Sequence, residues 1–289
     1  MAQSGGADAA RATLARLVVR LAGHIARDAL RTTRDPGPKN VHDLRIDVRR
    51  LRAVLRSLAS ELNPRLATEL QFDLKNVTRE TGPLRDADVS RSLLLPQIRD
   101  SPQLPADVKR NSAVALEQAR VDARRALRLR MRDPAWAERL GRIRALAKDR
   151  DLLASLTQPL TGLVRGTVVG QVVDLRRRMR RRRLGADRLH RLRMRIRDAR
   201  YTAEALLPLL ARRPAPLAGS LHELQDALGS THDLIEARRL LAQGTLPVEA
   251  REALAQDMDA LIERQLRRCR KRLRRIAEKP PLAWRPWLA

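Results

Sequence analysis

Apolar residues recur at intervals of three and four along nearly the whole chain, which is the period of an amphipathic α-helix and not of a strand. Proline stands between most of these stretches, where helix starts and loops tolerate it. The pattern predicts helices over residues 8–34, 40–62, 65–80, 85–98, 105–131, 135–155, 159–183, 186–211, 216–228, 231–243 and 247–278. No convincing strand is found, so the predicted fold class is all-α.

The chain contains an internal repeat, which two pairs of matching segments reveal. Residues 41–52, VHDLRIDVRRLR, match residues 189–200, LHRLRMRIRDAR, at a separation of 148 residues. Residues 82–88 match residues 229–235 at a separation of 147, and each copy has a glycine followed three and four positions later by a basic residue and aspartate. Two matches in one register indicate a duplication. We expect one domain over residues 1–289, divided into a first helical repeat at 8–133, a connecting segment at 134–158, a second repeat at 159–278 and a C-terminal tail at 279–289.

The repeated helix has a basic stripe directly beside its apolar face. On a helical wheel the apolar face consists of Val41, Leu44, Val48, Leu51, Leu55 and Leu58 in the first copy and Leu189, Leu192, Ile196, Ala199, Ala203 and Leu206 in the second. The stripe consists of His42, Arg45, Arg49, Arg52 and Arg56 in the first copy and His190, Arg193, Arg197 and Arg200 in the second. Glu204 takes the place of Arg56 in the second copy. Because the stripe flanks the core instead of opposing it, we expect it to line a groove between helices.

The charge of the chain indicates an anionic partner. There are 60 basic residues against 33 acidic ones, a formal net charge of +27, and six of the basic residues are lysines. Such an excess opposes compaction and attracts polyanions. Arginine suits phosphate because its planar guanidinium pairs two oxygens and stays protonated. We expect further basic positions outside the repeated stripes to gather around the same groove: Arg20, Arg27, Arg176, Arg180, Arg268, Lys271 and Arg275.

Composition and motifs argue against a membrane or secreted protein. Aromatic residues make up 2% of the chain, so the core must be aliphatic, which favours packed helices. The one cysteine, Cys269, cannot form an internal disulfide and fits a reducing compartment. The N-terminal residues do not have the pattern of a signal peptide, and no apolar run is long enough to span a membrane. We therefore predict a cytoplasmic protein without a membrane partner, and the sequence does not set its oligomeric state.

The C-terminal tail is too rich in proline for a helix, and we expect Trp284 and Trp287 to lie across an apolar surface as a terminal strap.

A nucleic-acid-binding protein is one alternative, since the same charge attracts DNA and RNA. Against it, the few aromatic residues cannot build a stacking platform, and no zinc-finger, RRM or basic-zipper signature occurs. We nevertheless expect weak nonspecific binding to nucleic acid at low salt.

An enzyme, either a metal-dependent phosphohydrolase or a histidine phosphoacceptor, is a less favoured alternative. The five histidines contain no paired metal-ligand spacing, so we predict no catalytic residue, metal or cofactor. Asp86, Asp88 and Asp233 are the best acidic candidates, and we interpret them as caps of helices that start after Gly82 and Gly229.

The chain resembles the conserved-histidine α-helical domain family, CHAD. The resemblance rests on VHDLRIDVRRLRAVLRSL from Val41, LHRLRMRIRDARYTAEALL from Leu189, GPLRDADV from Gly82 and LQDALGSTHDL from Leu224, and it covers nearly the whole chain. It implies two similar antiparallel bundles of about four main helices each, related by pseudo-two-fold symmetry. It also implies a noncatalytic protein that binds inorganic polyphosphate and localises to polyphosphate granules. The Glu-x-Glu-x-Lys strand of the catalytic CYTH domain, which precedes CHAD in some relatives, does not occur, so the chain resembles the stand-alone form.

Carried over to this chain, the family's basic and histidine positions are His42, Arg45, Arg49, Arg52, His190, Arg193, Arg197 and Arg200. Asp198 stands where a basic residue is common, so the second copy is expected to bind less strongly. On this hypothesis Arg45→Glu with Arg49→Glu abolishes most of the affinity for polyphosphate and leaves the helicity intact.

Overall fold

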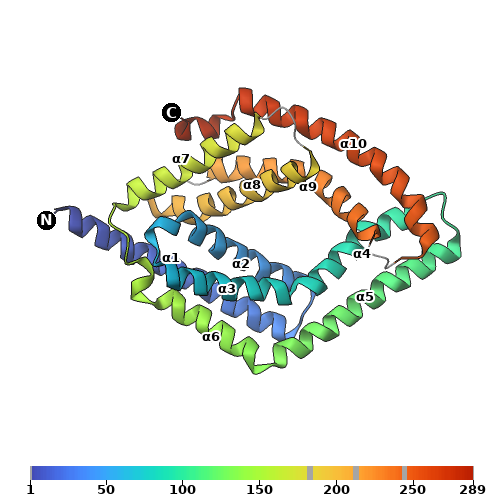
Figure 1. Ribbon diagram of the computed structural model, residues 1–289, viewed down its shortest axis with the longest axis horizontal. Coiled ribbons are helices and arrows are strands. Elements are labelled where there is room, and N and C mark those ends of the chain that lie inside the picture. The colour runs from blue at the N-terminus through green and yellow to red at the C-terminus, as the bar shows by residue number, and fades with distance from the viewer. Residues whose placement is uncertain (1, 181–184, 211–214, 243–245, 289) are drawn as a thin grey trace.

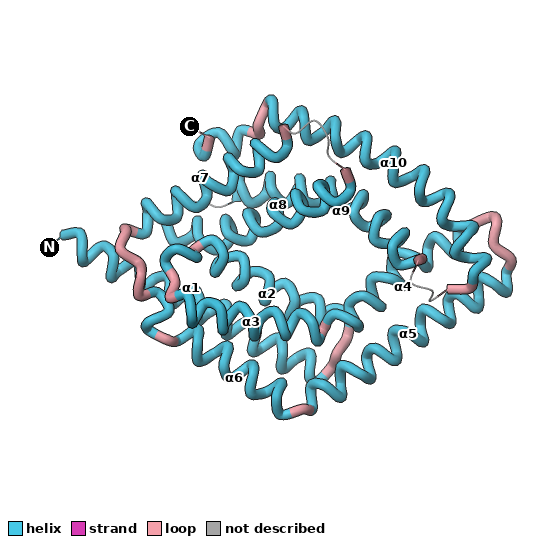
Figure 2. The backbone as a smooth tube through the Cα atoms, in the orientation of Figure 1, coloured by secondary structure: helices cyan, strands magenta, loops and turns pink. Residues whose placement is uncertain are grey.

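The computed structural model describes residues 2–180, 185–210, 215–242 and 246–288, and the regular structure within these ranges is helical throughout (Figure 2). In the first half the helices are α1 (Ala2–Arg34), α2 (Pro38–Ser57), α3 (Pro64–Glu80), α4 (Gly82–Asp100), α5 (Ala106–Arg132) and α6 (Pro134–Lys148). In the second half they are α7 (Leu160–Met179), α8 (Ala186–Leu206), α9 (Ala215–Leu241) and α10 (Val248–Glu278). Short 3-10 helices cover Ala59–Glu61, Arg150–Leu153, Leu207–Leu210 and Leu282–Trp287. The all-α prediction is confirmed.

The helices form two bundles that meet at the centre and again at one end. In the first half α1, α2, α3 and α6 pack together, and in the second half α7, α8, α9 and α10 do so. Helices α2 and α8 join the two halves at the centre. The α4–α5 hairpin extends away from the first bundle and contacts α9 and α10 (Figure 1). The large hydrophobic core runs through both bundles, and a smaller cluster lies where α4 and α5 meet α9 and α10.

The apolar faces predicted for the repeated helices α2 and α8 are the buried faces. All twelve predicted positions are at most 6% exposed, including Leu44, Val48 and Ile196 at 0%. Helical periodicity predicted them correctly because it depends on local geometry alone. Burial of these two faces brings the basic stripes beside them to the junction between the bundles.

Helix α9 is continuous where the sequence predicted two helices, 216–228 and 231–243. In the first repeat the chain turns at Thr81, and α4 begins with Gly82 and Pro83. Proline has no N–H and clashes with the preceding helical turn, so it begins a new helix. In the second repeat Ser230 stands in the place of Pro83, and the helix continues through this point. The prediction of a break there was wrong because one local substitution removed it.

The segment predicted to connect the repeats contains α6, which packs on α1 and α3. Arg142 pairs with the buried carboxylate of Asp73 at 2.9 and 3.0 Å, and Arg139 pairs with Glu80 at 2.6 Å. The predicted helix 135–155 ends at Lys148, and its last part forms the 3-10 helix at residues 150–153. The ends predicted at residues 183, 211 and 243 lie outside the described residues.

The C-terminal tail covers the second bundle as expected, although it forms a 3-10 helix instead of an irregular strap. Trp284 is 1% exposed and Trp287 is 7% exposed, and both belong to the large core. The indole Nε1 of Trp284 donates a hydrogen bond of 2.7 Å to Ser220 Oγ on α9. Trp136, at the start of α6, lies 148 residues before Trp284 and is also buried. The two tryptophans, one at the start of α6 and one in the tail, have the same separation as the repeated helices.

Candidate anion-binding site

The site lies where α2 crosses α8, which is the central contact between the two bundles. Ser57 Oγ on α2 and Thr202 Oγ1 on α8 share a hydrogen bond of 2.8 Å, and Gln171 of α7 donates to Ser57 at 2.9 Å. Because the apolar faces of both helices are buried, the arginines beside those faces are carried into the junction. Neighbouring turns of α4 and α9 add their own basic residues to it.

We call this group the central basic site. It consists of His42, Arg45 and Arg49 on α2, Arg85 on α4, Arg193 and Arg197 on α8, and His232 on α9. The two repeats contribute to it jointly, since the charge of Arg197 acts on Arg45 and Arg49 in the other half. The structure therefore brings five of the nine predicted stripe residues together with two that the stripe did not contain.

Burial and like-charge repulsion disfavour the protonated forms of Arg45, Arg49 and Arg193 and lower their pKa values. Burial, followed by the charges of Arg197, Arg45 and Arg85, lowers the pKa of Arg49 to about 10. Burial also lowers the pKa values of Arg45 and Arg193. Bringing an anion into the site relieves this repulsion, because a negative charge nearby favours the protonated guanidinium.

Several donors in the site have no protein acceptor. The Nε atoms of Arg45, Arg193 and Arg197 are buried and make no hydrogen bond within the described part of the chain. Arg45 is held in place by its Nη1, which donates to Thr78 O at 2.6 Å and to Thr81 Oγ1 at 3.2 Å. Buried donors without partners cost free energy, so a ligand with several acceptor oxygens would stabilise the site.

Three carboxylates lie near the five arginines of the site: Asp86, Asp233, and Asp198, whose Oδ1 is 3.6 Å from Arg197 Nη2. Asp86 lies near Arg45, and Asp233 lies near Arg193, yet burial raises the pKa of both carboxyls. The interpretation of Asp86 and Asp233 as helix caps is wrong. The N-cap of α4 is Thr81, whose side chain makes no capping bond, and Asp233 lies in the interior of α9. Asp88 is buried on α4 with no hydrogen-bond partner among the described residues, so it is not a cap either.

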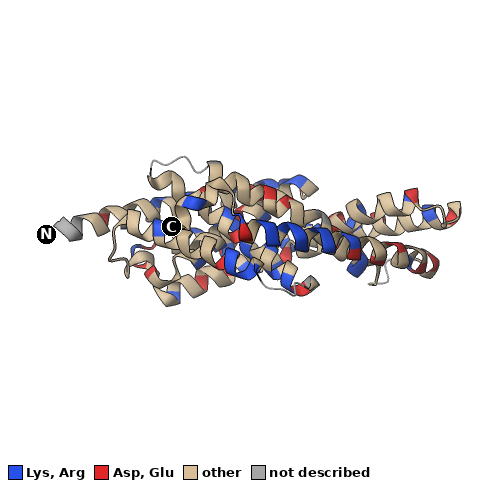
Figure 3. Cartoon of the chain, turned by 90° about the horizontal axis from the view of Figure 1, so that it is seen from above, with Lys and Arg blue, Asp and Glu red and all other residues tan. Residues whose placement is uncertain are grey.

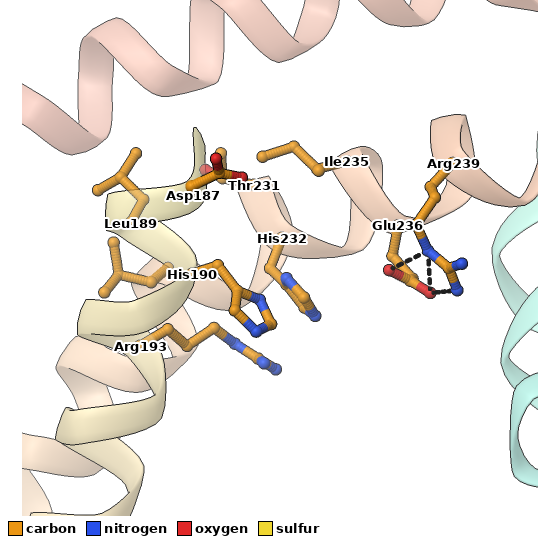
Figure 4. Close-up of a pocket in the computed structure, with 10 residues that line it drawn as sticks. Asp187, Leu189, His190, Arg193, Thr231, His232, Ile235, Glu236 and Arg239 are labelled. Carbon is orange, nitrogen blue, oxygen red and sulfur yellow. Dashed lines mark hydrogen bonds and ion pairs between the residues drawn. The ribbon is translucent and has the colours of Figure 1, made fainter. Parts of the chain in front are cut away.

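The histidines of the site are neutral in the free protein. Burial, followed by the charge of Arg85, lowers the pKa of His42. Burial, followed by the charges of Arg193 and His190, lowers the pKa of His232 to about 4. The rings of His190 and His232 lie 5.1 Å apart, centroid to centroid, at the edge of the site (Figure 4). Neutral imidazoles beside arginines can gain a proton when an anion binds.

Two acidic departures in the second repeat form ion pairs with the first repeat. Arg56 Nη2 lies 2.8 Å from Asp198 Oδ2, and Arg50 Nη2 lies 3.9 Å from Glu204 Oε2. Asp198 corresponds to Arg50 and Glu204 corresponds to Arg56 in the 148-residue register. Each acid therefore pairs with the arginine that occupies the other acid's equivalent position. The pairs place opposite charges across the α2–α8 contact, where two identical copies would place like charges.

This arrangement predicts a charge-swap rescue. Arg56→Asp places two carboxylates opposite each other and is expected to lower the free energy of unfolding by about 0.5–1 kcal/mol, the upper range for partly exposed pairs. Adding Asp198→Arg is expected to recover most of that loss in urea denaturation. Strictly additive losses in the double variant would show that the two side chains do not interact.

Apart from His190 and Arg52 at its edge, the other predicted site residues lie away from the central basic site, so one groove shared by all of them is not formed. Arg176 donates from Nε to Ala277 O at 3.0 Å, and Arg180 lines a cavity between α7 and α10. The residues Arg268, Lys271 and Arg275 line a basic groove on α10 with Arg267, Arg270, Arg272 and Arg274. Figure 3 shows the basic residues of this helix gathered along one stretch. Arg181, Arg182 and Arg183 lie outside the described residues.

The remaining predicted residues also have separate surroundings. Arg20 lines a cavity of about 280 Å³ between α1 and α8, and Arg27 is exposed on α1. Arg200 pairs with Glu204 at 3.5 Å and contacts His222 at 2.7 Å. Arg52 donates to Gln71 Oε1 at 3.2 Å, and the charge of Arg197 reaches it at the edge of the central basic site. The binding roles of all these residues stay predictions.

Arg85 and His232 are the two site residues that helical periodicity missed. They occupy the basic position of the repeated segment after Gly82 and Gly229, so the internal repeat already marked them. The residues next to them in the sequence did not indicate that α4 and α9 turn toward α2 and α8.

The described residues contain no cluster of three or more side chains suited to a metal ion, and no described helix has the length and apolar character needed to cross a bilayer.

Comparisons with known proteins agree with this architecture. The model of the CHAD domain family matches residues 12–242. Among solved structures, PptA from Streptomyces chartreusis superposes with a TM-score of 0.69 at 19% identity, covering 93% of this chain and 99% of that one. The CHAD domain from the plant Ricinus communis superposes with a TM-score of 0.66 at 21% identity, covering 96% and 91%. No curated protein matches the chain.

Proposed function

Because the chain belongs to the CHAD family, we propose that it binds inorganic polyphosphate through the central basic site and performs no catalysis there. One observation carries the proposal: buried guanidinium groups from both repeats converge on one place with unpaired Nε donors and too few carboxylates. A chain of phosphates supplies closely spaced oxygens and negative charge without requiring a base or sugar pocket. Arginine pairs such oxygens in a bidentate way.

The basic groove on α10 supports a longer path for the same ligand. It has a volume of about 860 Å³ and seven basic residues among its eight lining residues. A polyphosphate chain that leaves the central basic site would meet this second basic surface if it passed around the second bundle. As part of the proposal we place the protein in the cytoplasm at polyphosphate granules.

Titration calorimetry with a long polyphosphate at near-physiological salt tests the function. Single- and double-stranded DNA of matched charge serve as competitors, since nonspecific binding to DNA is purely electrostatic and falls steeply with salt. We expect tight polyphosphate binding that DNA does not displace. Equal or tighter binding to DNA would overturn the proposal in favour of a nucleic-acid-binding protein.

Proton uptake is a second expected result. His42 and His232 have lowered pKa values and are neutral near pH 7, and bound phosphate raises these values because it favours the charged ring. Affinity for polyphosphate is therefore expected to rise as the pH falls from about 8 to about 6, with protons taken up on binding. Calorimetry in two buffers of different ionisation enthalpy measures the uptake.

The variant His42→Gln with His232→Gln separates this effect from titration of the phosphate chain ends. The ends titrate equally with both proteins, so the difference in proton uptake belongs to the histidines. Equal uptake of protons by the variant and the original protein would refute the assignment to the histidines.

In the free protein the same lowered pKa of His232 reduces the free energy of unfolding as the pH falls from 6.5 toward 4, because the unfolded chain then binds a proton that the folded chain excludes.

A further inference from the structure

A cavity of about 380 Å³ opens beside the central basic site, between the start of α8 and the middle of α9 (Figure 4). Its lining residues are Asp187, Leu189, His190, Arg193, Leu228, Thr231, His232, Ile235, Glu236 and Arg239. Arg193 belongs both to this lining and to the central basic site. A ligand bound to the arginines can therefore continue directly into the cavity.

The walls of this cavity do not suit an inorganic phosphate chain. Leu189, Leu228 and Ile235 line it, and the rings of His190 and His232 add flat surfaces. Phosphate oxygens gain nothing from aliphatic walls, because burial without hydrogen bonds is costly for a charged group. The lining of the cavity is complementary to a ligand that has an apolar or aromatic part next to its phosphates.

The corresponding positions of the first repeat have a different character. Arg85 occupies the position of His232, Asp88 that of Ile235, and Thr81 that of Leu228. The first repeat thus has charged or polar side chains where the second has an imidazole and two aliphatic side chains. Leu228 and Ile235 are specific to the second copy, whereas Leu189 has an apolar counterpart in Val41 and Thr231 has one in Leu84.

The edges of the cavity offer acceptors for amino groups. Asp187 and Glu236 both line the cavity, and Arg239 Nε pairs with Glu236 at 3.0 Å (Figure 4). Carboxylates accept hydrogen bonds from the exocyclic amino group of adenine, guanine or cytosine. Such a flat ring also gains from stacking on an imidazole face.

We propose that this cavity binds the base of a nucleoside triphosphate whose phosphates lie on Arg193 and its neighbours in the central basic site. The proposal rests on the proposed function, because it assigns the phosphates to the same arginines. It extends the ligand class from inorganic polyphosphate to organic polyphosphates. The second repeat then recognises the organic end of a ligand, while both repeats hold the phosphates.

Calorimetry with ATP and with inorganic tripolyphosphate, which has a similar charge and number of phosphates, tests the proposal. ATP is expected to bind at least about ten-fold more tightly, the factor that ~1.4 kcal/mol provides. Ile235→Trp, which fills the cavity, is expected to reduce ATP affinity to that of tripolyphosphate and to leave tripolyphosphate binding unchanged. Leu228→Phe, a milder filling, is expected to act in the same direction, and circular dichroism verifies that both variants fold.

Leu209→Trp is the matched control, because it adds the same bulk to the separate cavity between α1 and α8. We expect it to leave the preference for ATP intact. Equal binding of ATP and tripolyphosphate by the original protein, or an ATP preference that survives in folded Ile235→Trp and Leu228→Phe, would overturn the inference and leave the polyphosphate function standing. Failure of long polyphosphate and tripolyphosphate to bind would instead refute the proposed function itself.

Discussion

Arg49→Glu combined with Arg193→Glu is expected to lower the affinity for polyphosphate by at least about 100-fold, since a hydrogen bond to a charged group contributes about 1.5–3 kcal/mol and two such donors are lost. The single variant Arg49→Glu is expected to keep or raise the free energy of unfolding, whereas Arg193→Glu places a carboxylate near Asp233 and is expected to lower it. Arg49 lies among Arg45, Arg85 and Arg197, so a carboxylate there replaces repulsion by attraction. Calorimetry and urea denaturation of the same samples measure the two quantities.

Arg49 and Arg193 make a cleaner test than the pair Arg45 and Arg49 that the sequence suggested. Arg45 donates to Thr78 O and Thr81 Oγ1, so its replacement also removes a link between α2 and the turn before α4. Arg110→Glu with Arg144→Glu is the matched control, because it makes the same change in net charge at exposed positions of α5 and α6. If the control loses as much affinity as the site variant, net charge and not the central basic site determines binding.

Trp284→Ala is expected to lower the free energy of unfolding by about 3–5 kcal/mol, the usual cost of removing a buried tryptophan. Its side chain is 1% exposed in the core of the second bundle and donates to Ser220 Oγ at 2.7 Å. Loss of the ring leaves a cavity under the tail and removes the donor to Ser220 Oγ, which keeps its own hydrogen bond to Leu217 O at 3.0 Å. Urea denaturation followed by far-ultraviolet circular dichroism measures the loss.

Two comparisons make this prediction specific. Leu282→Ala, in the same 3-10 helix but 74% exposed, is expected to change stability by less than about 0.5 kcal/mol. Trp284→Phe loses the hydrogen bond to Ser220, whereas Trp136→Phe removes a buried indole N–H that has no partner among the described residues. We therefore expect Trp136→Phe to be the less costly of the two. A harmless Trp284→Ala would show that the tail does not stabilise the second bundle.

The fold class and the core faces of α2 and α8 follow from the sequence because they depend on local geometry. Residues three and four apart share a helix face whatever the helix packs against, so Leu44 and Ile196 are identified as core without any knowledge of the partner helix. The internal repeat also identified the equivalent histidines and arginines. It even marked Arg85 and His232 as repeated basic positions.

The exact partners of the charged residues were decided by the tertiary structure. The sequence marked Glu204 as a departure from the repeat and Asp198 as a departure from the family pattern, but not that each forms an ion pair with an arginine of the other half. It also suggested a common groove for residues such as Arg20 and Lys271, which lie in separate places.

The sequence by itself thus determined the helices, their buried faces and the excess of arginine. The tertiary structure alone decided which arginines share one site, because that depends on where α2 crosses α8 and on how α4 and α9 approach the crossing. Electrostatic interactions act through space between residues distant in the chain, and their strength depends on burial. Arg49 and Arg197 belong to one site because the two helices meet there, although nearly 150 residues separate them.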